Sequence, residues 1–350
     1  MLLEENVPLA PMTTLRLGGP ARFFVEAKTV GEVQEAVAVA RSRNLPLFVL
    51  GGGSNLLVAD SGWPGLVLKV AIPGIERRAG EIEGKALFDV GAGESWDRFV
   101  SHAVMAQGAG VECLSGIPGS VGGTPVQNVG AYGEEVSQTI ESVEVLDRKD
   151  GQVRELCREA CVFTYRSSIF NTTERGRFVI LRVTYALTPE GQPRIGYADL
   201  KRHFEGRETS PNLAETREAV RHIRALKGML IVAGDPDSQS AGSFFKNPVI
   251  SPERHADLRR RAAAKGLTLP SYPALEKSQK ISAAWLVEHS GFARGYGVGQ
   301  AGISSKHALA IVNRGGATAA EVLALKDQIQ QRVEQIWGVQ LEPEPVMVGF

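Results

Sequence analysis

The chain has 350 residues, of which 43% are hydrophobic and 22% charged, so it is long enough for two or three folded domains and too apolar for a disordered protein. Lys and Arg together number 39, as do Asp and Glu, and this zero net charge argues against a nucleic-acid partner, which calls for a basic surplus.

The sequence shows no segment typical of an exported or membrane-spanning protein. The N-terminal segment is acidic early and has no long apolar core, so we expect no signal peptide. No run approaches the ~20 apolar residues of a membrane-spanning helix. Cys113, Cys157 and Cys161 are too few for a disulfide framework, and no second Cys/His pair lies at zinc-site spacing to complement Cys157 and Cys161. We therefore expect a cytoplasmic protein without metal or membrane contact and, because no heptad seam is present, a monomer.

A first α/β unit is expected from about residue 13 to residue 70. The pattern predicts strands at 22–27, 45–50 and 66–70. Thr29 and Glu32 have the spacing of a capping box, and the apolar residues that follow keep helical spacing: Val33, Ala36, Val37 and Ala40.

A second unit follows the first. The sequence predicts a strand at 86–90, a helix with its apolar stripe from Trp96 to Val104 that Gly108 can terminate, and a strand at 178–187. Asp150-Gly151 between two apolar runs predicts a hairpin with strands at 143–146 and 153–156.

The last third of the chain is predicted to be mainly helical. Helices are expected near 213–226, 252–265, 283–289 and 318–337, with a loop at 228–247. Thr318 and Glu321 form a second capping box, and Gly338 can end the last helix.

Two glycine-rich loops in the first half are candidate phosphate-binding segments. Gly51, Gly52, Gly53, Ser54 and Asn55 follow a buried strand, where glycine lets backbone N–H groups approach an anion closely. The second loop, IPGSVGGTPVQNVGAYG at 117–133, is too apolar for a flexible linker. Either loop alone also fits an ordinary tight turn. Together they favour a large ligand that carries a pyrophosphate, such as a dinucleotide.

Three further residues are candidates for chemistry, each with a plain structural alternative. Arg166, in YRSSIF at 165–170, suits an anion at fixed geometry, or a surface ion pair. Ser243, in AGSFFKNP at 241–248, is held beside two phenylalanines, or caps a turn. Glu344 lies between two prolines; a single Glu is usually just solvated, so it is a candidate only together with Arg166 and Ser243.

In their order and spacing these motifs resemble the UDP-N-acetylenolpyruvoylglucosamine reductases, the MurB family of peptidoglycan precursor synthesis, in the class with a substrate-closing tyrosine loop. The motifs are GGGSNLL at 51–57, the loop at 117–133, YRSSIF, AGSFFKNP and LEPE at 341–344. The resemblance runs from about Thr13 to Val346.

The resemblance implies an α+β fold: a two-part FAD-binding region of the vanillyl-alcohol-oxidase (PCMH) type and a separate α+β substrate-binding domain. We expect FAD-binding subdomains at 1–75 and 76–226 and a substrate domain at 227–338. The tail at 339–350 is expected to pack back near the second subdomain.

The resemblance also implies an activity, UDP-N-acetylmuramate dehydrogenase. Noncovalent FAD, reduced by NADPH, would pass hydride from N5 to the enolpyruvyl CH₂ of UDP-GlcNAc-enolpyruvate, and Ser243 would supply a proton. Arg166, Ser243 and Glu344 match the family's catalytic residues. The flavin contacts expected within the two glycine-rich loops are Gly51, Gly52, Gly53, Ser54, Asn55, Gly119, Ser120, Gly122, Gly123 and Asn128. The substrate contacts are Tyr132, Tyr197, Lys227 and Asn247.

Two rival functions stay open on sequence alone. The first is an FAD oxidase or dehydrogenase of the same fold acting on another small molecule, since a fold does not fix a function. The second is a nucleotide-binding regulatory module without catalysis.

Overall fold

The computed structural model describes residues 1–297 and 299–350, and these residues form two compact units. Unit 1 consists of residues 1–7, 20–53 and 63–226, and unit 2 of residues 8–19, 54–62 and 227–350. Both expected FAD-binding subdomains thus have most of their residues in unit 1, while the tail at 339–350 belongs to unit 2.

The first sheet of unit 1 has four strands, in the order β1-β2-β5-β3. These are β1 (Glu4–Pro8), β2 (Pro20–Ala27), β5 (Trp63–Val70) and β3 (Leu47–Leu50), of which β2, β5 and β3 run parallel. Between β2 and β3 the chain forms α1 (Val30–Ser42), and both hydrogen bonds of the expected capping box are present at Thr29. The α1 stripe predicted from the sequence is buried, as expected for a crossover helix that covers a parallel sheet.

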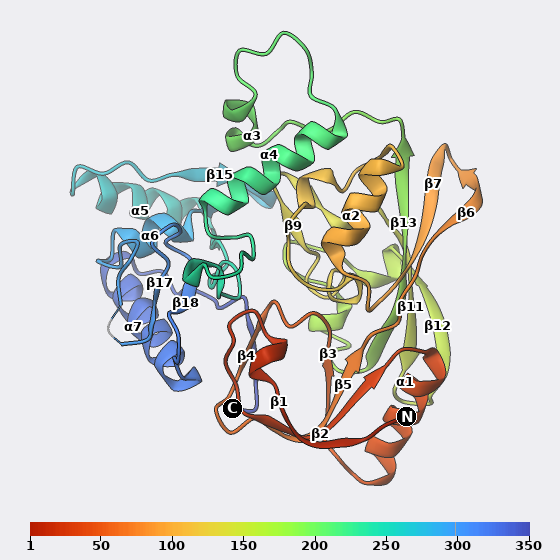
Figure 1. Ribbon diagram of the computed structural model, residues 1–350. Helices are drawn as coiled ribbons and strands as arrows, with labels where there is room; N and C mark the ends of the chain where they lie inside the picture. The colour runs from red at the N-terminus through yellow and green to blue at the C-terminus, as the bar shows by residue number, and fades with distance from the viewer. Residues whose placement is uncertain (298) are drawn as a thin grey trace. The chain divides into compact units, whose positions relative to one another are not determined.

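The second sheet of unit 1 is antiparallel, in the order β12-β11-β13-β7-β6 (Figure 1). Its strands are β12 (Val153–Cys157), β11 (Ile140–Asp147), β13 (Phe178–Pro189), β7 (Lys85–Gly91) and β6 (Ile75–Ile82), and β8 (Gly108–Ala109) pairs with β13. The hairpin predicted around Asp150-Gly151 is therefore confirmed.

The helices of unit 1 that follow are α2 (Trp96–Met105), α3 (Ala198–His203) and α4 (Leu213–Leu226). The α2 stripe packs on β13, where the rings of Phe99 and Tyr185 lie 4.7 Å apart. The predicted stop at Gly108 is wrong, because the helix ends at Met105 and the left-handed residue is Gln107, with φ of 56°. Gly108 serves close packing instead: a Cβ there would lie 3.1 Å from the side chain of Leu187.

Unit 2 is built around three helices, α5 (Pro252–Ala263), α6 (Ala283–Glu288) and α7 (Ala319–Trp337). The predicted capping box at Thr318 and the C-terminal Gly338, with φ of 68°, are both confirmed in α7. Trp337 is 1% exposed and its indole donates to the hydroxyl of Ser290 at 3.1 Å. One apolar core joins α5, α6 and α7 with residues from the segments 8–19 and 54–62.

Short elements complete the two units. In unit 2, β14 (Val249–Ile250), β16 (Gln279–Ile281) and β15 (Ser271–Pro273) form a small sheet, β17 (Ala301–Ile303) pairs with β18 (Ile311–Asn313), and β4 (Leu56–Val58) runs parallel to β19 (Val346–Val348). In unit 1, β9 (Gly130–Ala131) pairs with β10 (Glu134–Glu135). Single 3-10 turns lie at 10–12, 112–114, 121–123, 136–138, 159–161, 169–171, 236–238 and 275–277. Among the described residues, no helix combines the length and the apolar character needed to cross a membrane.

Candidate active site

The two glycine-rich loops touch each other in unit 1. A Cβ placed on Gly52 would lie 2.4 Å from Cα of Gly119, and one placed on Gly51 would lie 2.8 Å from Oγ of Ser120. Any larger residue at position 52 would collide with backbone rather than with a movable side chain. The glycines are therefore required by the approach of the two loops, which lie far apart in the sequence.

The second loop is held in place by the backbone before α2. The carbonyls of Ala92 and Glu94 each accept a hydrogen bond of 2.9 Å, from the N–H of Gly122 and of Val121 respectively. Gly119 has φ of 126°, which disfavours a side chain, and its carbonyl accepts the Trp96 N–H. The loop thus has one defined shape at the end of β7 and the start of α2.

Ser120 supplies evidence that this contact is a ligand cradle. Its side chain is 7% exposed, and its Oγ has no hydrogen-bond partner among the described residues. A buried hydroxyl without a partner costs free energy that a ligand acceptor can recover. Narrow glycine loops and a donor aimed at an acceptor are what phosphate oxygens need. The residues present therefore fit the pyrophosphate of FAD.

The first glycine motif is divided between the units. Gly51, Gly52 and Gly53 belong to unit 1, and Ser54 and Asn55 to unit 2. Nδ2 of Asn55 donates to the carbonyl of Glu344 at 3.1 Å, and the carbonyl of Asn55 accepts the N–H of Val346 at 2.9 Å. Asn55, expected at the flavin, thus holds the tail that carries Glu344.

Asn128 is engaged by the protein on both ends of its amide. Its Nδ2 donates to Oε2 of Glu135 at 2.9 Å and to the carbonyl of Thr164 at 3.0 Å. Its Oδ1 accepts the N–H of Ser137 at 3.1 Å. These bonds give Asn128 a positioning role, since they tie the second glycine loop to the turn that contains Arg166.

Arg166 lies in that turn, with its side chain directed to β9. Its Nη2 donates to the carbonyl of Gly130 at 2.8 Å. Its backbone has φ of 55°, which is unusual for a residue with a side chain. Ser168 then caps a 3-10 turn, and Nδ2 of Asn171 donates back to the Arg166 carbonyl at 3.2 Å. The YRSSIF motif therefore folds locally to hold one guanidinium.

Tyr132 and Tyr197, both expected at the substrate, lie together in unit 1. Their rings meet edge to face, with centroids 5.4 Å apart. Tyr132 also forms a side-chain hydrogen bond with Arg224, and burial raises the pKa of the Tyr132 hydroxyl to about 12. Tyr197 is 44% exposed, just before α3.

Arg224 is a candidate that sequence reasoning missed. It is 9% exposed, on the same face of α4 as Ala219, Val220 and Ile223, and burial lowers the pKa of its guanidinium. A cation on the apolar face of an amphipathic helix was the available signal, because such a residue is rarely buried without a purpose.

Ser243 and Glu344 lie on adjacent backbone segments of unit 2. Phe245 and Pro343 form an isolated antiparallel bridge, and the carbonyl of Phe244 accepts the N–H of Glu344 at 2.9 Å. Phe244 and Phe245 are 0% and 2% exposed, so this backbone is anchored in the core. Both expected catalytic residues are half-buried and adjacent to these anchors.

Lys227 and Asn247 complete the expected set. Lys227 is the first residue of the long final segment of unit 2, directly after α4. Oδ1 of Asn247 accepts the N–H of Ala283 at 2.9 Å at the start of α6, which leaves the Nδ2 group of Asn247 as the donor for a ligand.

A buried carboxyl pair lies beside the second glycine loop. Glu112, Cys113 and Glu134 are buried and place potential ligand atoms within 4.8 Å of one another. Burial, and then the charge of Glu112, raises the pKa of Glu134 to about 8, and burial raises the pKa of the Cys113 thiol. Burial favours the neutral form of the Cys113 thiol and of Glu134, and protonated groups are poor metal ligands, so the cluster does not favour a metal.

Two protein-family models match the chain. The model described as an FAD binding domain matches residues 21–156, and the model described as the C-terminal domain of UDP-N-acetylenolpyruvoylglucosamine reductase matches residues 235–348. Both glycine-rich loops lie in the first match, and Ser243 and Glu344 lie in the second.

Curated relatives and a solved structure resemble the chain along its length. It is 45% identical to a UDP-N-acetylenolpyruvoylglucosamine reductase of Thermobifida fusca, over 99% of this chain and 98% of that protein. It is 44% identical to one from Streptomyces coelicolor, over 99% of this chain and 90% of that protein. The crystal structure of the corresponding reductase (MurB) from Thermus caldophilus matches with a TM-score of 0.67 and 28% identity, over 99% of this chain and 100% of that chain.

Proposed function

Because this chain belongs to the UDP-N-acetylenolpyruvoylglucosamine reductase family and is therefore an FAD-dependent oxidoreductase, we propose that it reduces UDP-GlcNAc-enolpyruvate to UDP-N-acetylmuramate, with NADPH as reductant. Of the fold expected from the resemblance, an FAD-binding region followed by a separate C-terminal domain is confirmed by the two family matches. The proposal places the enzyme in peptidoglycan precursor synthesis, as a cytoplasmic monomer.

The cofactor would be held by the contact between the glycine-rich loops. Gly51, Gly52 and Gly119 let the two loops approach closely enough for their backbone N–H groups to face one phosphate group, and the buried Ser120 hydroxyl has no hydrogen-bond partner among the described residues. Bound FAD would accept hydride from NADPH and supply it to the terminal CH₂ of the enolpyruvyl group. Neither loop contains a histidine that could tether the cofactor, which supports noncovalent binding.

Addition of hydride to the CH₂ leaves negative charge on the neighbouring carbon and on its carboxylate. Arg166 and Lys227 are the cations proposed to meet this charge, and Arg166 is fixed for the task by its bond to Gly130. Removal of one such fixed donor typically lowers the rate by ~10²–10³.

The carbanion-like carbon must then gain a proton. A serine hydroxyl is a weak acid, but an enolate carbon is basic enough to take its proton when the two are held within reach. We assign this step to Ser243, which would donate from Oγ. Glu344 would orient that donor or a water molecule beside it. Ser243 directly precedes Phe244, and the carbonyl of Phe244 accepts the N–H of Glu344.

Tyr132, Tyr197 and Asn247 would bind and enclose the substrate, and the structure adds Arg224 to this group. An arginine buried beside Tyr132 suits a carboxylate or phosphate of the substrate. Tyr197 is the exposed member of the tyrosine pair, so it is the one able to move when a substrate enters.

The observation that carries the proposal is the backbone pairing that holds Ser243 and Glu344 on adjacent segments. The test is a stopped-flow measurement of the two half-reactions. NADPH should bleach the flavin of the purified protein, and UDP-GlcNAc-enolpyruvate should restore its absorbance faster than air does. Fast reoxidation by oxygen with no response to the enolpyruvyl substrate would favour an oxidase of the same fold instead.

A further inference from the structure

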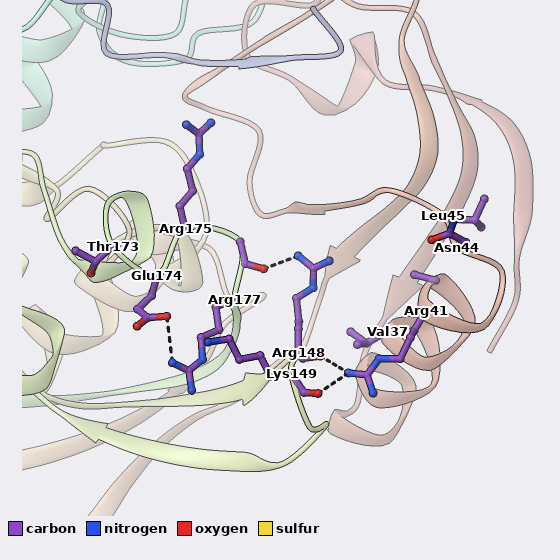
Figure 2. A pocket seen from close by; sticks show the side chains of 12 residues that line it. Val37, Arg41, Asn44, Leu45, Arg148, Lys149, Thr173, Glu174, Arg175 and Arg177 are labelled. Carbon is purple, nitrogen blue, oxygen red and sulfur yellow. Dashed lines mark hydrogen bonds and ion pairs between the residues drawn. The ribbon is translucent and has the colours of Figure 1, made fainter.

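Unit 1 has a cavity that the proposed reaction does not use. It has a volume of about 540 Å³ and lies between α1, the turn that follows β11, and the segment 173–177 (Figure 2). Pockets of roughly 300–1,000 Å³ are typical of small-molecule sites. All the residues that line it belong to unit 1, and the flavin cradle shares none of them.

The cavity concentrates positive charge on a chain that is neutral overall. Five cationic side chains line it, and Glu174 is the one lining carboxylate; the cations are Arg41, Arg148, Lys149, Arg175 and Arg177. They come from three separate elements and meet around one hollow. Such a cluster costs electrostatic free energy unless anions balance it.

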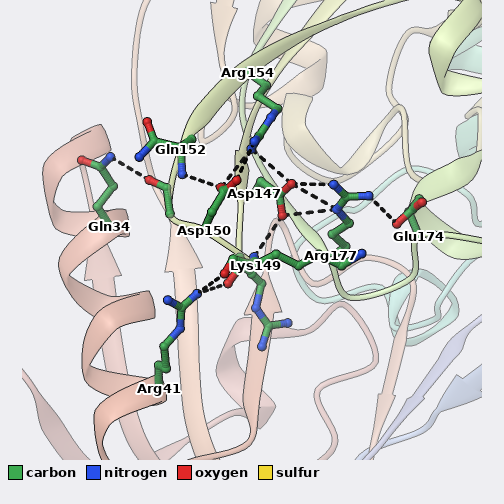
Figure 3. A network of polar contacts seen from close by, with 11 residues as sticks. Gln34, Arg41, Asp147, Lys149, Asp150, Gln152, Arg154, Glu174 and Arg177 are labelled. Carbon is green, nitrogen blue, oxygen red and sulfur yellow. Dashed lines mark hydrogen bonds and ion pairs between the residues drawn. The ribbon is translucent and has the colours of Figure 1, made fainter.

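Acidic partners account for one of the five cations. Arg177 pairs with the buried Asp147 at 2.7 Å and with Glu174 at 3.1 Å (Figure 3). Arg154 pairs with Asp147 as well, so that carboxylate is already saturated. For Arg41, Arg148, Lys149 and Arg175 the described part of the chain supplies no acidic partner within ion-pair distance.

Two of these guanidinium groups are fixed in place by backbone oxygens. Nη1 of Arg148 donates to the carbonyl of Gly176 at 2.5 Å. Nη2 of Arg41 donates to the carbonyls of Arg148 and Lys149, the second at 3.1 Å. Each guanidinium keeps further N–H donors, so both are oriented for a ligand before it arrives.

The charged form of Arg148 is disfavoured in this arrangement. Burial lowers the pKa of its guanidinium, and the positive charge of Arg41 lowers it further. Two like charges held close together by backbone contacts, rather than by a carboxylate, are a feature of sites that bind an anion.

We propose that this cavity binds an oligophosphate group carried by a small molecule, of the kind found in nucleoside diphosphates and triphosphates. Two or more linked phosphates would span cations that come from three elements, which a single carboxylate could not do. A concave site of this volume suits a small ligand rather than a flat macromolecular surface. The neighbouring apolar wall of Val37, Ala40 and Leu45 gives the non-phosphate part of such a molecule a surface to contact.

The test is calorimetric titration of the FAD-loaded full chain with sodium tripolyphosphate, and separately with ATP. We expect one tripolyphosphate per chain, with affinity that falls as NaCl is raised, because screening weakens such contacts. Tighter binding of ATP would show that the apolar wall contributes. Equal binding would assign the affinity to the phosphates alone, as proposed.

The variant K149A/R175A removes two cations that hold no ion pair, so the fold should be kept. Affinity should fall about tenfold for each cation removed. Arg43→Ala is the matched control. Arg43 follows the last turn of α1, close in sequence to Arg41 but outside the cavity lining, so its loss should leave the affinity unchanged. If the double variant proved unstable, Lys149→Glu would replace it.

Three results would overturn the proposal: no heat of binding, the same affinity in K149A/R175A, or an equal loss in Arg43→Ala. The last would indicate unspecific attraction to a basic surface. Because the titration needs no turnover, its outcome is independent of the proposed reduction of UDP-GlcNAc-enolpyruvate.

Discussion

The carbonyl of Phe244 accepts the N–H of Glu344 at 2.9 Å, and this bond joins two segments that lie at opposite ends of unit 2's long final stretch of chain. It fixes Ser243, the residue before Phe244, beside the tail that carries Glu344. The same tail is held from a third segment by Asn55, whose Nδ2 donates to the carbonyl of Glu344. Three distant parts of the sequence thus define one piece of backbone geometry.

The first prediction concerns Ser243→Ala. Reduction of the flavin by NADPH should stay near the wild-type rate, because the hydroxyl takes no part in it. Reoxidation by UDP-GlcNAc-enolpyruvate should slow by ~10²–10⁴, the usual contribution of a positioned acid or base. Stopped-flow absorbance separates the two steps.

Ser278→Ala is a suitable control for this experiment, since Ser278 lies in the same unit and its hydroxyl forms no hydrogen bond with the residues that the structure describes. Equal loss in both half-reactions of Ser243→Ala would remove Ser243 from the role of proton donor.

The second prediction concerns Gly52→Ala. The added Cβ would lie 2.4 Å from Cα of Gly119 and 2.6 Å from the backbone N of Ser120, so the two loops must separate. Overpacking of this kind costs roughly 1–3 kcal/mol, which corresponds to a loss of flavin affinity of about 5- to 150-fold if flavin binding requires the native contact of the loops. The ratio of flavin to protein absorbance after purification measures it.

Gly31→Ala is the control for the loop prediction. Apart from its chain neighbours and the backbone of its own helix, no described atom lies within 4 Å of the position of its Cβ, and Gly31 lies in α1, where alanine favours the helix. This variant should keep its flavin, and full retention of flavin by Gly52→Ala as well would contradict the cradle.

Local elements could be predicted from the sequence because their signals are local. The capping boxes at Thr29 and Thr318, the α1 stripe and the hairpin at Asp150-Gly151 each depend on residues within one turn or one strand pair. Short strands such as β14 and β15 carried no such signal, since two or three residues show no period.

The sequence predicted the candidate site as a set of motifs and did not indicate the contacts that these motifs make in the structure. The collision that makes Gly52 a glycine is with Gly119, and nothing near position 52 indicates it. Arg224 was missed because its helix reads as an ordinary amphipathic one. GGGSN was treated as one motif, yet its glycines and Asn55 belong to different units and have different tasks.

The third prediction concerns Tyr197→Phe. Phenylalanine keeps the edge-to-face contact with Tyr132, so the fold and flavin content should be unchanged. In the proposed site the Tyr197 hydroxyl would hydrogen-bond the anionic substrate, so its loss should raise KM about tenfold with a smaller effect on kcat. Steady-state assays with varied UDP-GlcNAc-enolpyruvate measure both constants, and unchanged values would exclude Tyr197 from the substrate site.

The last prediction concerns the pH dependence of stability at Glu134. Burial and the neighbouring Glu112 raise its pKa from an ordinary 4.5 to about 8 in the folded chain. Below pH 4.5 the carboxyl is protonated in both the folded and the unfolded states. Between pH 4.5 and about 8 the unfolded state loses the proton and the folded state keeps it, so the free energy of unfolding falls as the pH rises. Above that range the folded state holds a buried charge, and the loss is complete.

Glu134→Gln removes this titration and keeps an oxygen that can accept the N–H of Cys113, which lies 3.0 Å from Oε2 of Glu134. Its free energy of unfolding should lie close to that of the wild type near pH 5, where the loss has only begun, and exceed it above pH 8 by at least about 1 kcal/mol, since each unit of pKa shift corresponds to ~1.4 kcal/mol. Circular dichroism melts from pH 5 to pH 9 measure the difference. Glu218→Gln, an exposed change on α4, should follow the wild-type curve throughout. Parallel curves for Glu134→Gln and wild type would show that Glu134 ionises in the folded chain as it does in water.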